Sequence, residues 1–198
     1  MRTQKTKKKL TDALTQLLQS DRFEHISVTD LCKTSGVSRI TFYAYYDDKY
    51  QLVAALFDEM YQTAAVVFQA LEKAGNPEHR PVVSCCHLLN AIFDMQEQYQ
   101  DLTARLLAEE NPYLAFAYYW YVLRQAEEHV SEYLDALDPV HPLSMTASML
   151  CTGLWGFIRE GFRESRPRDE IRAGAEAVLY GFLCTPSLFR AVVLRDEP

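Results

Sequence analysis

The chain of 198 residues lacks the features that would place it in a membrane or an oxidising compartment. No run of apolar residues approaches the length of about 18 that a transmembrane helix needs, so we expect no membrane partner. The basic N-terminus precedes an amphipathic pattern instead of an apolar segment, which argues against a signal peptide. The five cysteines are odd in number and show no C-x-x-C spacing. Reduced thiols in a cytoplasmic protein are the simplest interpretation.

Sequence signatures of catalysis and of metal binding are also absent. The sequence has no glycine-rich nucleotide loop, no G-x-S-x-G and no H-E-x-x-H. Its five histidines lack H-x-x-x-H spacing, so a metal site would need distant segments to converge. Adjacent Cys85 and Cys86 could sense oxidants or bind a soft metal, but buried small apolar side chains are the better interpretation. We therefore expect neither an enzyme nor a cofactor.

Charge is distributed unevenly along the chain, although the net charge is −7. Residues 1–50 carry nine Lys and Arg against six Asp and Glu, whereas residues 51–198 carry eleven against twenty-one. A surface that binds phosphate groups needs cations locally, and only the first segment offers an excess of them. The acidic remainder would repel a polyanion and should face away from it.

Residues 27–49 contain two short helical patterns joined at Gly36. Ser27 can cap the first helix, with Asp30 completing a pattern like a capping box. Gly36 suits the left-handed position that ends this helix, because it has no Cβ. Ser38 can cap a second helix that runs to about Tyr46. A helix, a short turn with glycine and a second helix form a helix-turn-helix, whose second helix enters the DNA major groove.

The segment G-V-S-R-I-T-F-Y-A-Y-Y-D-D-K at residues 36–49 resembles the motif of TetR/AcrR-type transcriptional regulators. The resemblance covers about residues 5–60, and Tyr45 departs from it where the family usually has histidine. Cys32 replaces the usual alanine of the first helix. Together with the helical layout, the resemblance implies an all-α fold: an N-terminal three-helix helix-turn-helix domain (1–50) and a C-terminal helical bundle (51–198) for ligand binding and dimerisation.

The candidate DNA-binding residues all lie in this motif: Ser27, Thr29, Ser38, Arg39, Thr41, Tyr43, Tyr45 and Lys49. Arg39 is the best candidate for reading a base, because arginine makes bidentate bonds to guanine. The resemblance implies that Tyr43 and Lys49 contact phosphates. Thr41 and Tyr45 could touch a base edge, a thymine methyl or a phosphate. The hydroxyls of Ser27, Thr29 and Ser38 are either caps or surface groups, which we favour, or donors to phosphate.

The first helix should run to about Gln19, because apolar residues recur from Leu10 to Leu18 at helical spacing. Five basic residues precede them: Arg2, Lys5, Lys7, Lys8 and Lys9. They are either a solvated, frayed terminus or, as the resemblance implies, an arm over DNA phosphates. Phe23 and Ile26 are expected in the core, and Phe42 and Tyr46 should point inward.

From Asp48 a single helical pattern continues to Gly75, which is about 25 residues and roughly 37 Å. It is long enough to connect the two predicted domains. Further helices are expected over 82–99, 101–110, 112–137, 143–164 and 169–182, because prolines and polar turns separate these segments. No strand-like alternation of useful length is present.

Aromatic residues are unusually dense between Pro112 and Tyr133 and surround that predicted helix. They are either core and dimer packing or the wall of a cavity for an unknown small-molecule effector. The candidate ligand-binding residues are Phe93, Tyr113, Phe116, Tyr119, Trp120 and Trp155.

Segments 143–164 and 169–185 mix small and large apolar residues and resemble the dimerisation helices of the family. A homodimer would present two helix-turn-helix units to a palindromic operator in double-stranded DNA.

The expected function is a ligand-released repressor. The alternatives are a transcriptional activator, since residues 42–50 also resemble activators of dihydroxyacetone-kinase genes, and an effector-independent partner protein of the nucleoid-occlusion type. An α-helical enzyme with an incidental helix-turn-helix is the remaining alternative.

Overall fold

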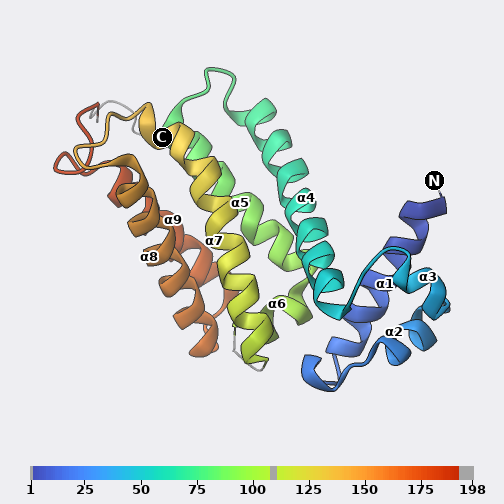
Figure 1. Ribbon diagram of the computed structural model, residues 1–198. Coiled ribbons are helices and arrows are strands. Elements are labelled where there is room, and N and C mark those ends of the chain that lie inside the picture. Colours follow the sequence, from blue (N-terminus) through green and yellow to red (C-terminus); the bar gives the residue numbers. More distant parts are fainter. Residues whose placement is uncertain (1, 108–110, 192–198) are drawn as a thin grey trace.

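The computed structural model describes residues 2–107 and 111–191, and its architecture is entirely helical (Figure 1). In chain order the elements are α1 (Arg2–Leu18), the 3-10 helix η1 (Phe23–His25), α2 (Val28–Ser35), α3 (Arg39–Tyr43), α4 (Lys49–Gly75), α5 (Pro81–Gln98), α6 (Gln100–Leu107), α7 (Pro112–Asp135), α8 (Leu143–Arg163) and α9 (Arg168–Leu183). Within the described ranges no sheet forms, and Pro139 pairs with Phe189 in an isolated bridge. The predicted all-α fold is confirmed.

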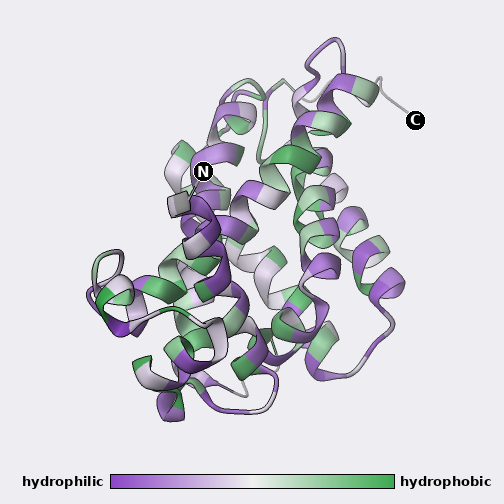
Figure 2. Ribbon diagram, turned by 90° about the vertical axis from the view of Figure 1, so that its right-hand side faces the viewer, coloured by the Kyte–Doolittle hydropathy of each residue, from purple (hydrophilic) through white to green (hydrophobic). Residues whose placement is uncertain are grey.

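Two groups of helices are connected through α4 (Figure 1). Helices α1, α2 and α3 cluster around the N-terminal end of α4, and the rest of α4 packs along α5. Helix α7 packs on α8, and α8 packs on α9. No helix in the described part of the chain is long and apolar enough to cross a membrane. Most helices carry hydrophobic residues on one side and hydrophilic residues on the other (Figure 2).

Local sequence explains where the helices begin and end. Ser27 and Asp30 form a full capping box at the start of α2, and Gly36 ends that helix with φ of 67°. Ser38 caps α3 and Asp48 caps α4. Helix α3 is shorter than predicted, because its regular turns end at Tyr43 instead of near Tyr46.

The hydrophobic core crosses the predicted domain boundary at residue 50. One cluster joins residues of α1 to α3 with residues of α4, and it extends to Met95, Leu106 and Tyr118 of the bundle. A second cluster is formed by α5, α7, α8 and α9 and the segment around Phe189. As predicted, Phe23, Ile26, Phe42 and Tyr46 are buried in the first cluster. The helix-turn-helix unit is therefore packed directly against the helices that follow it.

Candidate nucleic-acid interface and internal cavities

Helix α3 presents its N-terminal half outward. Arg39 is exposed, Ile40 is 87% exposed and Tyr43 is 49% exposed, whereas Phe42 is fully buried. The Arg39 guanidinium lies 6.0 Å from the centroid of the Tyr43 ring, so one side of the helix carries a cation over an aromatic ring. Sequence reasoning missed Ile40. Ile40 could have been noticed in the sequence, because it is an apolar residue between two predicted DNA contacts. The buried face of α3 does not require an apolar side chain at this position.

The predicted serines serve as helix caps. The amide of Thr41 donates to the Ser38 hydroxyl at 3.1 Å, and the hydroxyls of these two residues lie 2.8 Å apart. The Ser27 hydroxyl donates to the Asp30 carboxylate at 2.6 Å. That bond is the main reason why the pKa of Asp30 is lowered. The capping interpretation of Ser27 and Ser38 is confirmed, and Thr29 lies exposed on α2.

The N-terminal part of α1 brings basic side chains next to α3. The Lys7 ammonium lies 5.9 Å from the ring centroids of both Tyr45, which is half-buried, and Tyr46, which is buried. Lys5 and Lys9 are exposed on the same helix, and the side chain of Arg2 lies outside the described residues. A cation over an aromatic ring is favourable, which helps to hold this part of α1 beside α3.

Lys49 has a different environment from the predicted phosphate contact. Its ammonium donates to the carbonyl oxygens of Phe23 (2.8 Å), Glu24 (3.1 Å) and Ile26 (2.8 Å). It also lies 4.5 Å from the centroid of the Phe23 ring. Partial burial lowers the pKa of Lys49. Because an ammonium has three donors and these carbonyls accept from all of them, Lys49 fastens the start of α4 to η1.

Lys8, one of the five basic residues near the N-terminus, forms ion pairs within the chain. It pairs with Asp12 at 2.9 Å and with Glu59 of α4. The Glu59 carboxylate further accepts from the hydroxyls of Thr11 (2.9 Å) and Tyr99 (3.1 Å). The hydrogen bonds from Lys8 and Thr11 outweigh partial burial and lower the pKa of Glu59. One carboxylate thus connects α1, α4 and the end of α5.

A second junction connects η1 with the start of α7. The buried side chain of Asn111 accepts from the amide of Phe23 at 2.9 Å. The ring of Tyr113 stacks on that of Phe23 with centroids 5.6 Å apart, and Tyr50 meets both rings edge-on. Arg105 of α6 donates to the carbonyl of Leu18 at the end of α1. Residues 18–26 are therefore held by α4, α6 and α7 together.

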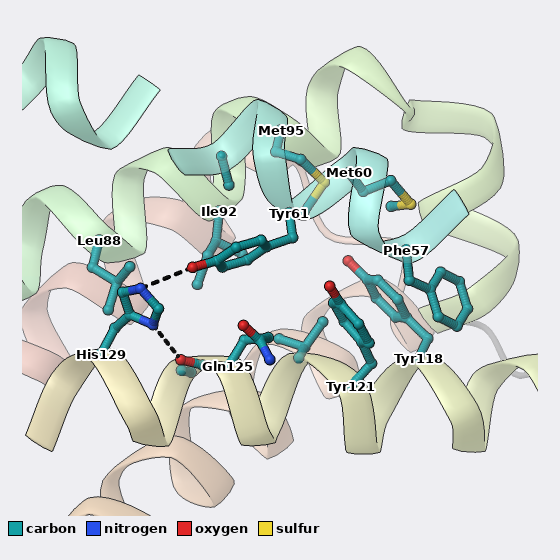
Figure 3. A pocket seen from close by; sticks show the side chains of 13 residues that line it. Phe57, Met60, Tyr61, Leu88, Ile92, Met95, Tyr118, Tyr121, Gln125 and His129 are labelled. Atoms are coloured by element: carbon teal, nitrogen blue, oxygen red, sulfur yellow. Dashed lines mark hydrogen bonds between the residues drawn. The ribbon is translucent and has the colours of Figure 1, made fainter. Parts of the chain in front are cut away.

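Two small internal spaces lie between the long helices. The first, of about 50 Å³, lies between α4, α5 and α7 (Figure 3). The second, of about 70 Å³, lies between α5, α7, α8 and α9. They share the residues Leu88, Ile92, Val122 and Ala126. Since drug-sized ligands occupy about 300–1,000 Å³, neither space holds one in this conformation.

A polar pair closes one end of the first space. The Nδ1–H of His129 donates to the carbonyl of Gln125 at 2.9 Å, which leaves Nε2 to accept from the Tyr61 hydroxyl at 2.8 Å (Figure 3). The Tyr121 hydroxyl donates to Asp58 at 2.7 Å. Sequence reasoning did not select these residues, because their helical spacing is that of an ordinary core face.

An open groove of about 480 Å³ runs between α6, α7 and α8. Phe116, Tyr119 and Trp155 line it, and Trp120 packs edge-on against Phe116 and Tyr119. Four predicted ligand-binding residues thus gather at this groove.

The other two predicted ligand-binding residues lie elsewhere. Phe93 is buried in the second core cluster, and Tyr113 belongs to the junction with η1. The six predicted ligand-binding residues therefore do not line one cavity. They are divided between the open groove, the second core cluster and the junction with η1.

The cysteines are thiols in apolar surroundings. Cys85 is buried, and burial raises the pKa values of both Cys85 and Cys86. Among the described residues, no three His, Cys, Asp or Glu side chains gather as a metal site. The interpretation as a buried apolar side chain is confirmed for Cys85, whereas Cys86 is only half-buried.

Comparison with known proteins identifies the fold. No protein-family model matches the sequence, and no curated protein matches it. Among solved structures, a protein from Syntrophomonas wolfei described as a TetR-family transcriptional regulator superposes with a TM-score of 0.73 at 10% identity, covering 98% of this chain and 99% of that one. The dihydroxyacetone kinase operon activator DhaS gives 0.62 at 16% identity, covering 90% and 96%. Thermus thermophilus FadR, a TetR-family repressor solved with lauroyl-CoA, gives 0.60 at 18% identity, covering 97% of each chain. The chain has the fold of TetR-family regulators.

The environment of Lys49 predicts a stability effect. Lys49→Met should lower the free energy of unfolding by about 1–3 kcal/mol, because the charge-assisted bonds to three carbonyls are lost. Urea titration followed by circular dichroism measures this change. Lys33→Met, which replaces an exposed lysine of α2, is the matched control and should be neutral within about 0.5 kcal/mol. If Lys49→Met left the stability unchanged and weakened the salt dependence of DNA binding, Lys49 would be a phosphate contact instead.

The junction at Asn111 predicts a local effect. Asn111→Ala leaves the amide of Phe23 without its acceptor and should destabilise the fold by about 1–3 kcal/mol. Amide hydrogen exchange should accelerate at Phe23 more than at Leu31 in the core of α2. Asn90→Ala removes an acceptor for Arg172 between α5 and α9 and should leave exchange at Phe23 unchanged. Equal exchange at Phe23 in both variants would contradict the proposed fastening.

Proposed function

We propose that this chain is a cytoplasmic transcriptional regulator that binds a palindromic operator as a homodimer and is released when a small molecule binds. The observation that carries the proposal is the outward presentation of Arg39, Ile40 and Tyr43 on α3, with Lys7 over Tyr45 just after the helix. An exposed isoleucine next to an arginine at a helix start has little use in packing. In the major groove, arginine can bind guanine and isoleucine can contact a thymine methyl.

The proposed dimer interface is the outer face of α8 and α9. Met145 is 65% exposed, and Met149, Phe157 and Val178 are also exposed. A Cβ placed at Gly153, Gly156 or Gly181 would meet no atom from another part of the described chain within 4 Å, so these positions leave room for a partner helix. A pair of such faces, related by a two-fold axis, would pack as a four-helix interface.

The proposed effector response is a shift between conformations. The first internal space borders α4 and α7, and the same two helices hold η1 through Lys49 and Asn111. A ligand that widens the spaces changes the position of these helices, and with it the spacing of the two α3 helices. It lowers operator affinity only by its differential affinity for the two conformations.

The activator alternative is supported by residues 42–50 and by the likeness to DhaS, whose name describes an operon activator. An activator would respond to the effector in the opposite direction but would use the same DNA-binding face. The effector-independent alternative is supported by the small volume of the internal spaces. It predicts operator affinity that no small molecule changes.

The DNA-binding face predicts separate effects for its two central residues. Arg39→Ala should cost about 1–3 kcal/mol on duplexes selected from random sequence and relax the preference at one base pair. Ile40→Ala should reduce discrimination at a neighbouring T·A pair and leave the salt dependence unchanged. Binding is measured by fluorescence anisotropy on the selected duplex and on single-base variants. Arg124→Ala, on the exposed side of α7, is the control. A wild-type protein indifferent to duplex DNA at low ionic strength would refute the proposal.

The interface predicts a change in assembly. Met149→Glu places a carboxylate opposite its own copy and should weaken the dimer at least tenfold, because burying unpaired charge is unfavourable. Sedimentation velocity over a concentration series gives the dissociation constant. Val66→Glu introduces the same charge at an exposed position of α4 and should leave the dimer unchanged. A monomeric wild type, or equal effects of both substitutions, would place the interface elsewhere.

A further inference from the structure

The open groove between α6, α7 and α8 is bordered by large aromatic side chains that the fold leaves exposed. Phe116 is 62% exposed and Trp120 is 52% exposed. They stand four residues apart on one side of α7, and their ring centroids are 6.0 Å apart. Neighbouring apolar side chains that stay exposed in this way are typical of a place where another molecule binds.

The shape of the groove suits a flat molecule of moderate size. Its volume of about 480 Å³ lies within the range of about 300–1,000 Å³ that small-molecule sites occupy. Phe116 and Tyr119 line it from α7, and the ring of Trp155 from α8 lies 5.3 Å from that of Tyr119. Gly156 also lines the groove, and a Cβ placed there would meet no atom from another part of the described chain within 4 Å. A ring system therefore has room to lie against the aromatic side chains.

The charges at the groove favour an anion. Arg159 of α8 is exposed and lines the groove, and among the described residues no Asp or Glu lines it. The adjacent Glu160 carboxylate accepts from Arg163 at 3.0 Å. Arg159 already has an interaction in the ligand-free chain, so a bound anion gains only the difference. Because exposed ion pairs contribute little, we expect anions to bind only about three- to fivefold more tightly than neutral molecules of the same shape.

The groove also adjoins two contacts that hold the N-terminal helices. Leu106 of α6 lines the groove and directly follows Arg105, which donates to the end of α1. Pro112 of α7 lines it and directly follows Asn111, which accepts from the start of η1. A ligand that moves α6 relative to α7 would therefore act on both contacts.

We propose that the groove between α6, α7 and α8 binds a flat aromatic anion, such as an aromatic carboxylate, with its rings against Phe116, Tyr119 and Trp155 and its charge toward Arg159. This inference deepens the proposed function, because it gives an effector a chemical class and a site apart from the internal spaces. It rests on that function only for the effect of binding on DNA affinity. Binding itself depends on the aromatic side chains and the arginine.

Titration calorimetry of the full-length protein with 2-naphthoate, 2-naphthalenemethanol and 2-naphthylmethylammonium tests the chemical class, because these probes share a ring system and differ in charge. 2-Naphthoate should bind with a dissociation constant of about 0.1 mM or lower. The alcohol should bind about three- to fivefold more weakly, and the ammonium more weakly still. Arg159→Met keeps an apolar stem and should remove the preference for the anion, while binding of the alcohol stays within about twofold.

Four substitutions test the location. Phe116→Ala should weaken 2-naphthoate binding about fivefold, whereas Val66→Ala, at an exposed apolar position of α4, should leave it unchanged. Gly156→Leu fills the groove and should weaken binding about tenfold. Its helix should remain intact, because leucine favours a helix more than glycine does. Gly153→Leu is the matched control, since Gly153 has the same open surroundings on α8 but does not line the groove.

The chain's two tryptophans, Trp120 and Trp155, give a second measure of location. Their indole N–H groups produce separate signals in a proton–nitrogen correlation spectrum, and Trp120→Phe assigns them. 2-Naphthoate should shift the signal of Trp155, and an unshifted signal at saturation would contradict binding in the groove.

Three calorimetric results would overturn the proposal: no 2-naphthoate binding at millimolar concentration, binding unchanged in both Phe116→Ala and Gly156→Leu, or equal or tighter binding of the alcohol or the ammonium. Equal losses in Gly153→Leu and Gly156→Leu would also overturn it, because the site would then depend on the dimer interface.

Operator binding is measured separately on the same proteins. Binding of 2-naphthoate in the groove with unchanged operator affinity would support the site and refute its effect on DNA binding. A ligand-free protein indifferent to duplex DNA would refute the regulator proposal and leave the calorimetric result standing.

Discussion

The fastening of residues 23–26 to α4 and α7 is the constraint on which the rest of the structure depends. This segment makes one short 3-10 turn, so most of its backbone polar groups lack partners within a helix. Buried backbone groups require partners, and here they come from elsewhere in the chain. Lys49 supplies three donors from the start of α4, and Asn111 supplies an acceptor from the start of α7. The segment leads directly into α2, so these contacts orient the helix-turn-helix.

Because of this fastening, the position of α3 depends on how the helices of the bundle are packed. Helix α1 is held to α4 and α5 through Glu59, and its C-terminal end is held by Arg105 of α6. Phe23 joins the aromatic rings of Tyr50 and Tyr113, which come from α4 and α7. Because packed interiors change by discrete rearrangement instead of gradual deformation, a shift of α4 relative to α7 must break some of these contacts or carry the N-terminal helices with it.

Local features of the chain could be predicted because their causes are local. The capping box of Ser27 and Asp30, the left-handed Gly36 and the amphipathic spacing of the helices depend on neighbouring residues only. The partners of Lys49 could not be predicted in this way. Its ammonium meets carbonyls more than twenty residues earlier in the chain, so no local pattern marks the contact. The resemblance to a family implies a phosphate contact for this lysine, which stays a prediction, and tertiary packing adds three carbonyl partners.

The aromatic residues of α7 show a further limit of sequence reasoning. Their density left open either core and dimer packing or one ligand-binding wall, but each residue of a helix is rotated by about 100° from the last. Phe116 and Trp120 therefore share the outer face, while Tyr118 points into the core between them. The sequence specifies the angular order of these rings. It does not specify which face meets α4, since that depends on how α5 and α8 pack.

In the proposed effector response, the small volume of the internal spaces connects ligand size to regulation. A ligand that fits without displacing α4 or α7 has the same affinity for both conformations, and such a ligand shifts no equilibrium. A ligand slightly larger than the present space must move one of these helices to enter. Both helices hold residues 23–26, so the work of opening the space acts on the contacts that orient α3. In the proposed effector response, a tight apolar space between helices that also hold residues 23–26 is therefore better suited to transmit binding than a large preformed cavity would be.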